Sequence, residues 1–150
     1  MKFFLKKLHL YYFLILLFLS FILLYPFIYF YSRSPTNFKR MNSLRWAFSL
    51  ATTSLSGIFY KFSYEQEIDW NRTYIICSNH TSNLDITAVI LLVKKNLVFM
   101  GKEELLKNFI TGIYFRTIDI PLKRDSKMSA FRAFKKAEES ILAGKNVVIF

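Results

Sequence analysis

The chain has 150 residues, enough for one modest domain, and 53% of them are hydrophobic and 19% aromatic. Its formal net charge of +11 is unevenly spread: residues 1–64 hold eight Lys or Arg and no acidic residue, whereas residues 65–150 hold thirteen basic and ten acidic residues. This asymmetry predicts a basic, apolar anchor followed by a more ordinary globular part. The basic residues of the anchor flank apolar segments instead of forming the dense patch that binds nucleic acid, so they favour anionic lipid as the partner.

The first predicted element is a long apolar helix. Three lysines within the first seven residues precede twenty-five uncharged residues, Leu8 to Ser32, rich in Leu, Ile, Phe and Tyr. About 20 apolar residues cross a bilayer core as a helix, so this run is long enough. It is too long for a usual signal-peptide core and lacks a small-residue cleavage site, the first alanine being Ala47. We interpret it as an uncleaved anchor in which Pro26 kinks the helix or ends its regular part.

The positive-inside rule predicts the orientation of this anchor from the basic residues on its two sides, and their numbers are nearly equal. Three lysines precede the apolar run, and four basic residues follow it: Arg33, Lys39, Arg40 and Arg45. The small excess favours a cytoplasmic position for the residues after 33. A tilted or re-entrant helix is the alternative.

A second helix is predicted over residues 41–60, after a break at Ser34–Asn37. Apolar residues recur there every three or four positions along one stripe: Leu44, Phe48, Ala51, Leu55, Ile58 and Phe62. Only fifteen uncharged residues separate Arg45 from Lys61, which is short for a full span. We expect an interfacial helix packed beside the first, with an ordinary core helix as the alternative.

From Glu65 onward, predicted strands alternate with predicted helices. The strands are 74–78, 97–100, 118–122 and 147–150, and the helices are 84–95, 103–115 and 127–143. Ser126 is the expected cap of the last helix and Gly144 its stop, and its apolar stripe is Met128, Phe131, Phe134, Ala137 and Ile141. The alternation predicts an α/β layered domain over 65–150, preceded by an anchor helix over 1–34 and a membrane-associated amphipathic helix over 35–64.

The segment Asn79-His80-Thr81-Ser82-Asn83-Leu84-Asp85 lies at a predicted strand-to-helix junction. In a regular helix, positions five apart lie about 140° apart, so they do not share a face. With His80 in the loop and Asp85 in the first helical turn, the carboxylate can fold back onto the imidazole, while Thr81, Ser82 or Asn83 caps the helix. An aspartate that accepts from one ring nitrogen leaves the other as a base. A capped helix start with a hydrogen-bonded histidine is the alternative.

This segment resembles the first motif of the glycerolipid acyltransferases, in which an apolar strand precedes Asn-His and an aspartate follows four residues later. Met100–Leu105 resembles the family segment in which a strand ends at a lysine and a helix begins. Gly112 falls where the family often has glycine, and Asp119–Arg124 resembles the second motif, a short strand ending in arginine, with Lys123 in place of an acid. The resemblance covers roughly residues 60–150 and is to bacterial 1-acyl-sn-glycerol-3-phosphate acyltransferases in particular.

The family's third motif, Glu-Gly-Thr-Arg after an apolar strand and a proline, would follow Phe150. The resemblance therefore implies that these residues form the N-terminal portion of an acyltransferase domain, as part of a longer enzyme or as a truncated product. The implied fold is an α/β layered domain behind membrane-anchoring helices, at a membrane (a bacterial inner membrane), with the domain facing the cytoplasm.

The implied reaction moves a fatty acyl group from acyl-CoA or acyl carrier protein to the sn-2 hydroxyl of lysophosphatidic acid, giving phosphatidic acid in phospholipid synthesis. His80 is then the general base, Asp85 orients it, and Arg124 binds the acceptor phosphate. Lys102 adds positive potential or is simply a solvated lysine. Backbone N–H groups after His80 are candidate donors to the oxyanion. The alternatives are another lysolipid or amino-lipid acceptor, or an inactive membrane-associated protein that binds lipid.

The only cysteine, Cys77, rules out an internal disulfide and is compatible with a reducing compartment. Direct attack of a hydroxyl on a thioester needs no acyl-enzyme, so Cys77 is expected to be a small buried strand residue. Cys77 and His80 match half of a zinc pattern, but the other histidine, His9, lies in the anchor, so no metal is expected. No cofactor is expected either, because the acyl thioester is a co-substrate. Two lysine pairs, Lys94-Lys95 and Lys135-Lys136, are expected to be solvated.

Overall fold

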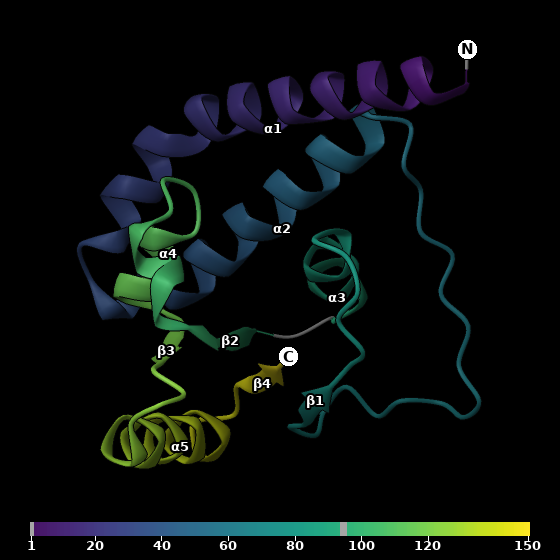
Figure 1. The fold of residues 1–150 in the computed structure, drawn as a ribbon. Helices are drawn as coiled ribbons and strands as arrows, with labels where there is room; N and C mark the ends of the chain where they lie inside the picture. The colour runs from purple at the N-terminus through teal and green to yellow at the C-terminus, as the bar shows by residue number, and fades with distance from the viewer. Residues whose placement is uncertain (1, 94–95) are drawn as a thin grey trace.

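The computed structural model describes residues 2–93 and 96–150, which form two long helices followed by a parallel sheet with helices on both faces (Figure 1). The strands are β1 (Ile75–Cys77), β2 (Leu97–Lys102), β3 (Ile120–Leu122) and β4 (Asn146–Ile149). The helices are α1 (Lys2–Ser32), α2 (Phe38–Leu55), α3 (Leu84–Leu92), α4 (Gly112–Thr117) and α5 (Lys127–Leu142), with short 3-10 helices η1 (Pro35–Asn37) and η2 (Glu103–Lys107). The predicted α/β architecture is confirmed.

The sheet has the strand order β1-β4-β2-β3, and every neighbouring pair is parallel. Side chains of β2 alternate between its two faces: Leu97 and Phe99 pack with α3, whereas Val98 and Met100 pack with α5. A parallel strand covered on both faces is apolar at every position, because successive side chains point to opposite layers. This explains why the central strands were readable from the sequence as continuous apolar runs.

Helix α5 contacts the sheet through small residues. Its buried side chains are Ala133 and Ala137, whereas Met128, Phe131 and Phe134 are 64%, 66% and 58% exposed, so most of the predicted apolar stripe is wrong. The alanines let the helix approach the sheet closely and leave the larger side chains outside the contact. Its predicted ends are confirmed: Ser126 Oγ accepts from the N–H of Ser129 at 3.2 Å, and Gly144 follows with a φ of +73°.

The helix predicted over 103–115 is instead two short elements, η2 and α4. Asn108 separates them, because its side-chain Oδ1 accepts from the N–H groups of Ile110 and Thr111 at 2.9 and 3.0 Å. An asparagine that bonds nearby backbone groups competes with helical hydrogen bonds. The chain turns here and brings Gly112 against the backbone of η2.

Gly112→Ala is expected to lower the free energy of unfolding by about 1–3 kcal/mol, the usual cost of overpacking. An added Cβ would lie 2.6 Å from the carbonyl oxygen of Leu106, a backbone atom that cannot rotate away. Urea unfolding in detergent, followed by circular dichroism, measures the change. Ser140→Ala on α5 is the control, and an equal midpoint for both variants would contradict the steric argument.

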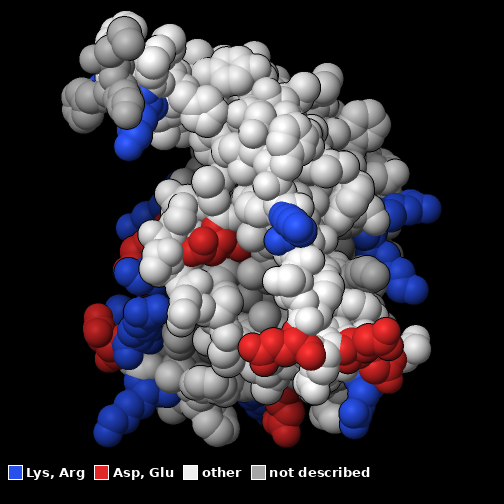
Figure 2. Space-filling view, turned by 90° about the vertical axis from the view of Figure 1, so that its right-hand side faces the viewer, with Lys and Arg blue, Asp and Glu red and all other residues white. Residues whose placement is uncertain are grey.

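Helix α1 is long and apolar enough over Phe4–Ser32 to cross a membrane. It runs without interruption through Pro26, so the proline does not end the helix. The last turns bend away from the rest of the helix in Figure 1, and a proline inside a helix produces such a kink. Phe21 and Ile28 are fully buried with residues of α2 and α4, but most other large apolar side chains of α1 are exposed. Figure 2 shows that this upper part of the surface is almost uncharged, which suits a membrane anchor.

Helix α2 lies between α1 and the α/β domain, so its predicted packing beside the first helix is confirmed (Figure 1). Its predicted bounds are wrong, because it ends at Leu55. The predicted stripe is right only in its first part: Leu44 and Phe48 pack in the core shared with α1, whereas Leu55 is 60% exposed. The buried face of α2 is largely polar and consists of Met41, Arg45, Phe48, Ser49, Thr52 and Thr53. Some of these polar groups bond their own helix, as when Thr53 Oγ1 donates to the carbonyl of Ser49 at 2.8 Å. Such bonds let a hydroxyl be buried at low cost.

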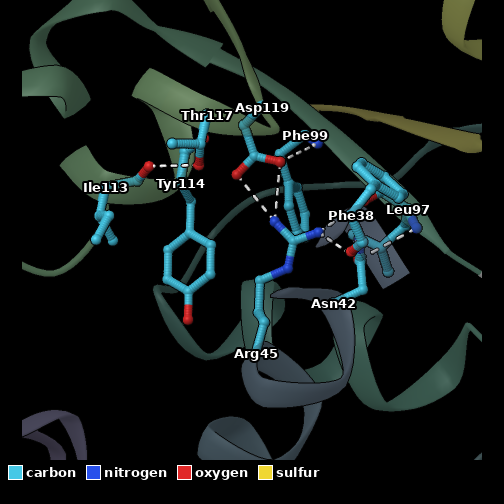
Figure 3. Close-up of polar contacts among 9 residues, drawn as sticks. All are labelled: Phe38, Asn42, Arg45, Leu97, Phe99, Ile113, Tyr114, Thr117 and Asp119. Atoms are coloured by element: carbon cyan, nitrogen blue, oxygen red, sulfur yellow. Dashed lines mark hydrogen bonds and ion pairs between the residues drawn. The ribbon is translucent and has the colours of Figure 1, made fainter. Parts of the chain in front are cut away.

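A buried ion pair joins α2 to the sheet (Figure 3). Arg45 Nη1 lies 2.9 Å from both carboxylate oxygens of Asp119, and the two side chains are 5% and 3% exposed. Arg45 Nη2 donates at 2.7 Å to Asn42 Oδ1 and to the carbonyl of Leu97, while Asp119 Oδ1 accepts from the N–H of Phe99 at 3.0 Å. The network ties α2 to β2 and to the residue before β3.

The position of Arg45 removes one charge from the argument about the orientation of the anchor, and the orientation itself stays a prediction. A guanidinium inside the domain does not face the membrane surface, so it does not count in the positive-inside comparison. Three basic residues, Arg33, Lys39 and Arg40, then follow the apolar run against three lysines before it. The charge balance therefore favours neither orientation.

Candidate active site

The carboxyl ends of the four parallel strands bring the predicted site residues to one edge of the sheet. His80 follows β1, Lys102 ends β2, Arg124 follows β3 and Phe150 follows β4. The register pairs Cys77 with Ile149 and Lys102 with Leu122, so neighbouring strands end at similar levels. Ligands of open α/β sheets commonly bind outside this edge.

His80 and Asp85 lie together, as their spacing predicts. His80 Nδ1 is 3.4 Å from Asp85 Oδ2, with the histidine in the loop after β1 and the aspartate in the first turn of α3. Their side chains are 37% and 27% exposed, so a substrate can reach them. A carboxylate beside Nδ1 leaves Nε2 as the ring nitrogen that can take a proton from a substrate.

Asp85 also organises the loop that carries His80. Its Oδ2 accepts from the N–H groups of Ser82 at 2.8 Å and Thr81 at 2.7 Å. These two bonds, with a smaller contribution from His80, hold the pKa of Asp85 below its usual value. The carboxylate therefore stays ionised at neutral pH, where it can attract a protonated imidazole.

Hydrogen bonds in this loop narrow the set of candidate oxyanion donors and identify the cap of α3. The N–H groups of Thr81 and Ser82 are already bonded to Asp85, so they are not free to bind an oxyanion. The cap of α3 is Asn83, one of the three predicted positions, but its side chain makes no capping bond. Ser82 Oγ, beside it, accepts from the N–H of Leu84 at 3.2 Å.

Phe150 connects the two parts of the site, a role that its position in an apolar strand pattern does not indicate. Its ring stacks on the imidazole of His80, with centroids 4.5 Å apart and planes at 25°. Its carbonyl accepts from Arg124 Nη2 at 3.2 Å. An imidazole and a guanidinium that follow strands β1 and β3 thus contact one residue. Strand order, which the sequence does not reveal, creates this contact.

The two candidate cations at this edge, Lys102 and Arg124, are exposed. Within residues 2–93 and 96–150, neither belongs to an ion pair. Both charges are therefore available to an anion in solvent. An arginine can present two parallel N–H donors to a phosphate or carboxylate, whereas a lysine acts as a point charge.

Cys77 is exposed, so its predicted burial is wrong. It lies on β1, which within residues 2–93 and 96–150 pairs with β4 alone. Ile76 beside it packs into the layer of α3, so Cys77 points to the opposite, less covered face. In the described part of the chain, no three His, Cys, Asp or Glu residues lie together where a metal could bind.

Of the two lysine pairs predicted to be solvated, Lys135 and Lys136 are exposed, while Lys94 and Lys95 lie outside the described residues.

Among curated proteins and among solved structures, none matches this chain. The family model described as Acyltransferase matches residues 60–150, which is more than half of the chain and includes His80, Asp85, Lys102 and Arg124. The parallel sheet with helices on both faces and the histidine–aspartate pair at its carboxyl edge lie within these residues. The chain belongs to the acyltransferase family.

Proposed function

We propose that this protein transfers a fatty acyl group from acyl-CoA or acyl carrier protein to the sn-2 hydroxyl of lysophosphatidic acid, giving phosphatidic acid. The observation that carries this proposal is the shared contact with Phe150, which joins the base candidate His80 to the guanidinium of Arg124. A small acceptor with a hydroxyl and a phosphate can then meet both groups. Lys102 adds a second positive charge at the same sheet edge.

In the proposed reaction, His80 Nε2 takes the proton of the acceptor hydroxyl while its oxygen attacks the thioester carbonyl carbon. A C–O bond forms and gives a tetrahedral oxyanion. When this intermediate collapses, the C–S bond breaks and the imidazolium returns its proton to the departing sulfur. Asp85 holds the imidazole by Nδ1 and stabilises the imidazolium, and no covalent acyl-enzyme forms. The thioester is a co-substrate, and the reaction uses no cofactor.

The anchor supports a substrate drawn from the membrane. With α1 in the lipid, the domain stays where a lysolipid and its product reside. We place the protein in a bacterial inner membrane with its domain on the cytoplasmic side, because the proposed thioester donors are cytoplasmic compounds.

An acceptor panel tests the proposal. The protein in phospholipid vesicles, supplied with labelled acyl-CoA or labelled acyl-acyl carrier protein, is expected to acylate lysophosphatidic acid much faster than lysophosphatidylcholine or the lyso form of an ornithine lipid. Lysophosphatidylcholine has the same free hydroxyl but a phosphodiester in place of the phosphomonoester. Equal rates with these two acceptors would contradict recognition of the phosphate, and preference for the ornithine lipid would assign another acceptor.

Arg124→Gln is expected to raise the KM for lysophosphatidic acid about 10- to 100-fold, with a smaller effect on kcat. This range corresponds to the loss of a hydrogen bond to a charged group, about 1.5–3 kcal/mol. Arg132→Gln, which removes an equal charge from the exposed surface of α5, is the matched control for general attraction to the lipid. Equal changes in KM for the two variants would remove Arg124 from the acceptor site.

A further inference from the structure

Four side chains form a continuous stack from the interior to the candidate site. The ring of Phe150 lies between His80 and Phe99, with centroid distances of 4.5 and 5.8 Å and interplanar angles of 25° and 22°. The guanidinium carbon of Arg45 lies 4.9 Å from the centre of the Phe99 ring. The stack begins at a buried residue of α2 and ends at an exposed histidine.

The inner members of this stack are firmly held. Phe99 is 6% exposed in the layer beneath α3, and its N–H donates to Asp119, the partner of Arg45. Phe150 packs against this same layer and its carbonyl accepts from Arg124. Phe150 therefore offers His80 a flat surface whose position is set by the core of the domain.

His80 needs such a surface because its polar contact defines only one ring atom. Asp85 faces Nδ1 at 3.4 Å, and the imidazole could still rotate about this contact. Rotation about the terminal torsion of a histidine is broad and weakly restricted. A parallel ring on one side fixes the imidazole plane and thus the direction in which Nε2 points. The face of an aromatic ring also attracts the imidazolium that forms when His80 takes a proton.

We propose that Phe150 is a positioning residue for His80. It acts through the imidazole and touches no reacting atom itself. This inference rests on the proposed function, in which His80 is the base, but the contact itself is testable without turnover.

Phe150→Leu and Phe150→Tyr distinguish the effect of the aromatic ring from the effect of the size of the side chain. Leucine keeps an apolar side chain and removes the aromatic face, whereas tyrosine keeps the face. In nuclear magnetic resonance spectra of protein labelled at histidine, the ring current of Phe150 is expected to shift the His80 ring protons upfield. The shift should be lost with leucine and kept with tyrosine. His9 in α1, whose Nε2 contacts the carbonyl of Ser56 at 2.9 Å, is the internal control.

The kinetic readout follows the same pair of variants. With leucine, kcat is expected to fall about 3- to 10-fold, the factor that corresponds to a usual aromatic contact, while the KM for lysophosphatidic acid stays within about twofold. With tyrosine, both constants should stay near those of the parent protein. A kcat loss without a change in KM is expected of a misdirected base, and a rise in KM alone would overturn the inference.

The outcomes distinguish this inference from the proposed function. If His80→Ala abolishes acyl transfer while Phe150→Leu leaves kcat and the His80 shift unchanged, the function stands and the positioning role is wrong. If His80→Ala stays active, the proposed base is wrong, and the role of Phe150 is overturned with it, although the spectra still report the stack. If Phe150→Leu shifts the His9 signals as well, the substitution has disturbed more than the stack. Phe150→Met, which also lacks a ring, then replaces Phe150→Leu, and the His80 shift and kcat are measured again.

Discussion

Asp119→Ala is expected to lower the free energy of unfolding by about 3–5 kcal/mol, the usual cost of removing one partner of a buried ion pair. The substitution leaves the guanidinium of Arg45 inside the domain without its carboxylate. It also removes the acceptor of the Phe99 N–H, so a backbone donor of the central strand β2 loses its bond. Denaturant unfolding in detergent, followed by circular dichroism, measures the change.

Two comparisons identify the cause of this loss. The double variant Arg45→Met with Asp119→Leu removes both charges and keeps an apolar interior, so it is expected to be more stable than Asp119→Ala alone. Asp125→Ala removes an exposed acid just after β3 and should change stability by no more than about 0.5 kcal/mol. If Asp119→Ala is as stable as Asp125→Ala, the ion pair does not hold α2 to the sheet.

His80→Ala is expected to lower the kcat of acyl transfer about 10²- to 10⁴-fold, the usual contribution of a positioned general base. The loss should appear in kcat more than in the KM of either substrate, because the imidazole acts on the proton that moves during attack. The ring is 37% exposed, so its removal is expected to leave the fold intact. Initial rates in vesicles, over a range of both substrates, measure the effect.

His9→Ala is the matched control, because the two histidines are the only ones in the chain and His9 lies in α1. It should keep the parent rate. Asp85→Asn keeps the size of the side chain and removes its charge, so it is expected to lower kcat as well, through the imidazolium it no longer stabilises. A parent-like rate for His80→Ala would exclude His80 as the base.

The parts of the fold that depend on local patterns were predictable. The apolar run of β2, the cap at Ser126 and the glycine stop at Gly144 each depend on a few neighbouring residues, and the structure has all three. The contact of His80 with Asp85 was predictable for the same reason, since only four residues separate them. The length and composition of α1 similarly indicated a possible membrane span.

The parts that depend on strand order or on distant packing were not predictable. Arg45 looked like a flanking charge because its partner, Asp119, lies 74 positions along the chain. Phe150 looked like an ordinary strand residue, because its contact with His80 requires β4 to lie beside β1. The prediction of the buried face of α5 failed because alanine and phenylalanine are both apolar, so the sequence does not show which of them contacts the sheet. The tight contact with the sheet buries the alanines and leaves the phenylalanines exposed.

The strand order also has a consequence for how the chain acquires this structure during synthesis. Among the strands of the described residues, β1 has β4 as its only neighbour in the sheet, and about 70 residues separate these two strands in the sequence. While the ribosome makes the intervening residues, α1 and α2 are complete, but β1 and the His80 loop have no strand to pair with. The loop is therefore expected to become protected from proteolysis and from amide hydrogen exchange only once β4 has emerged.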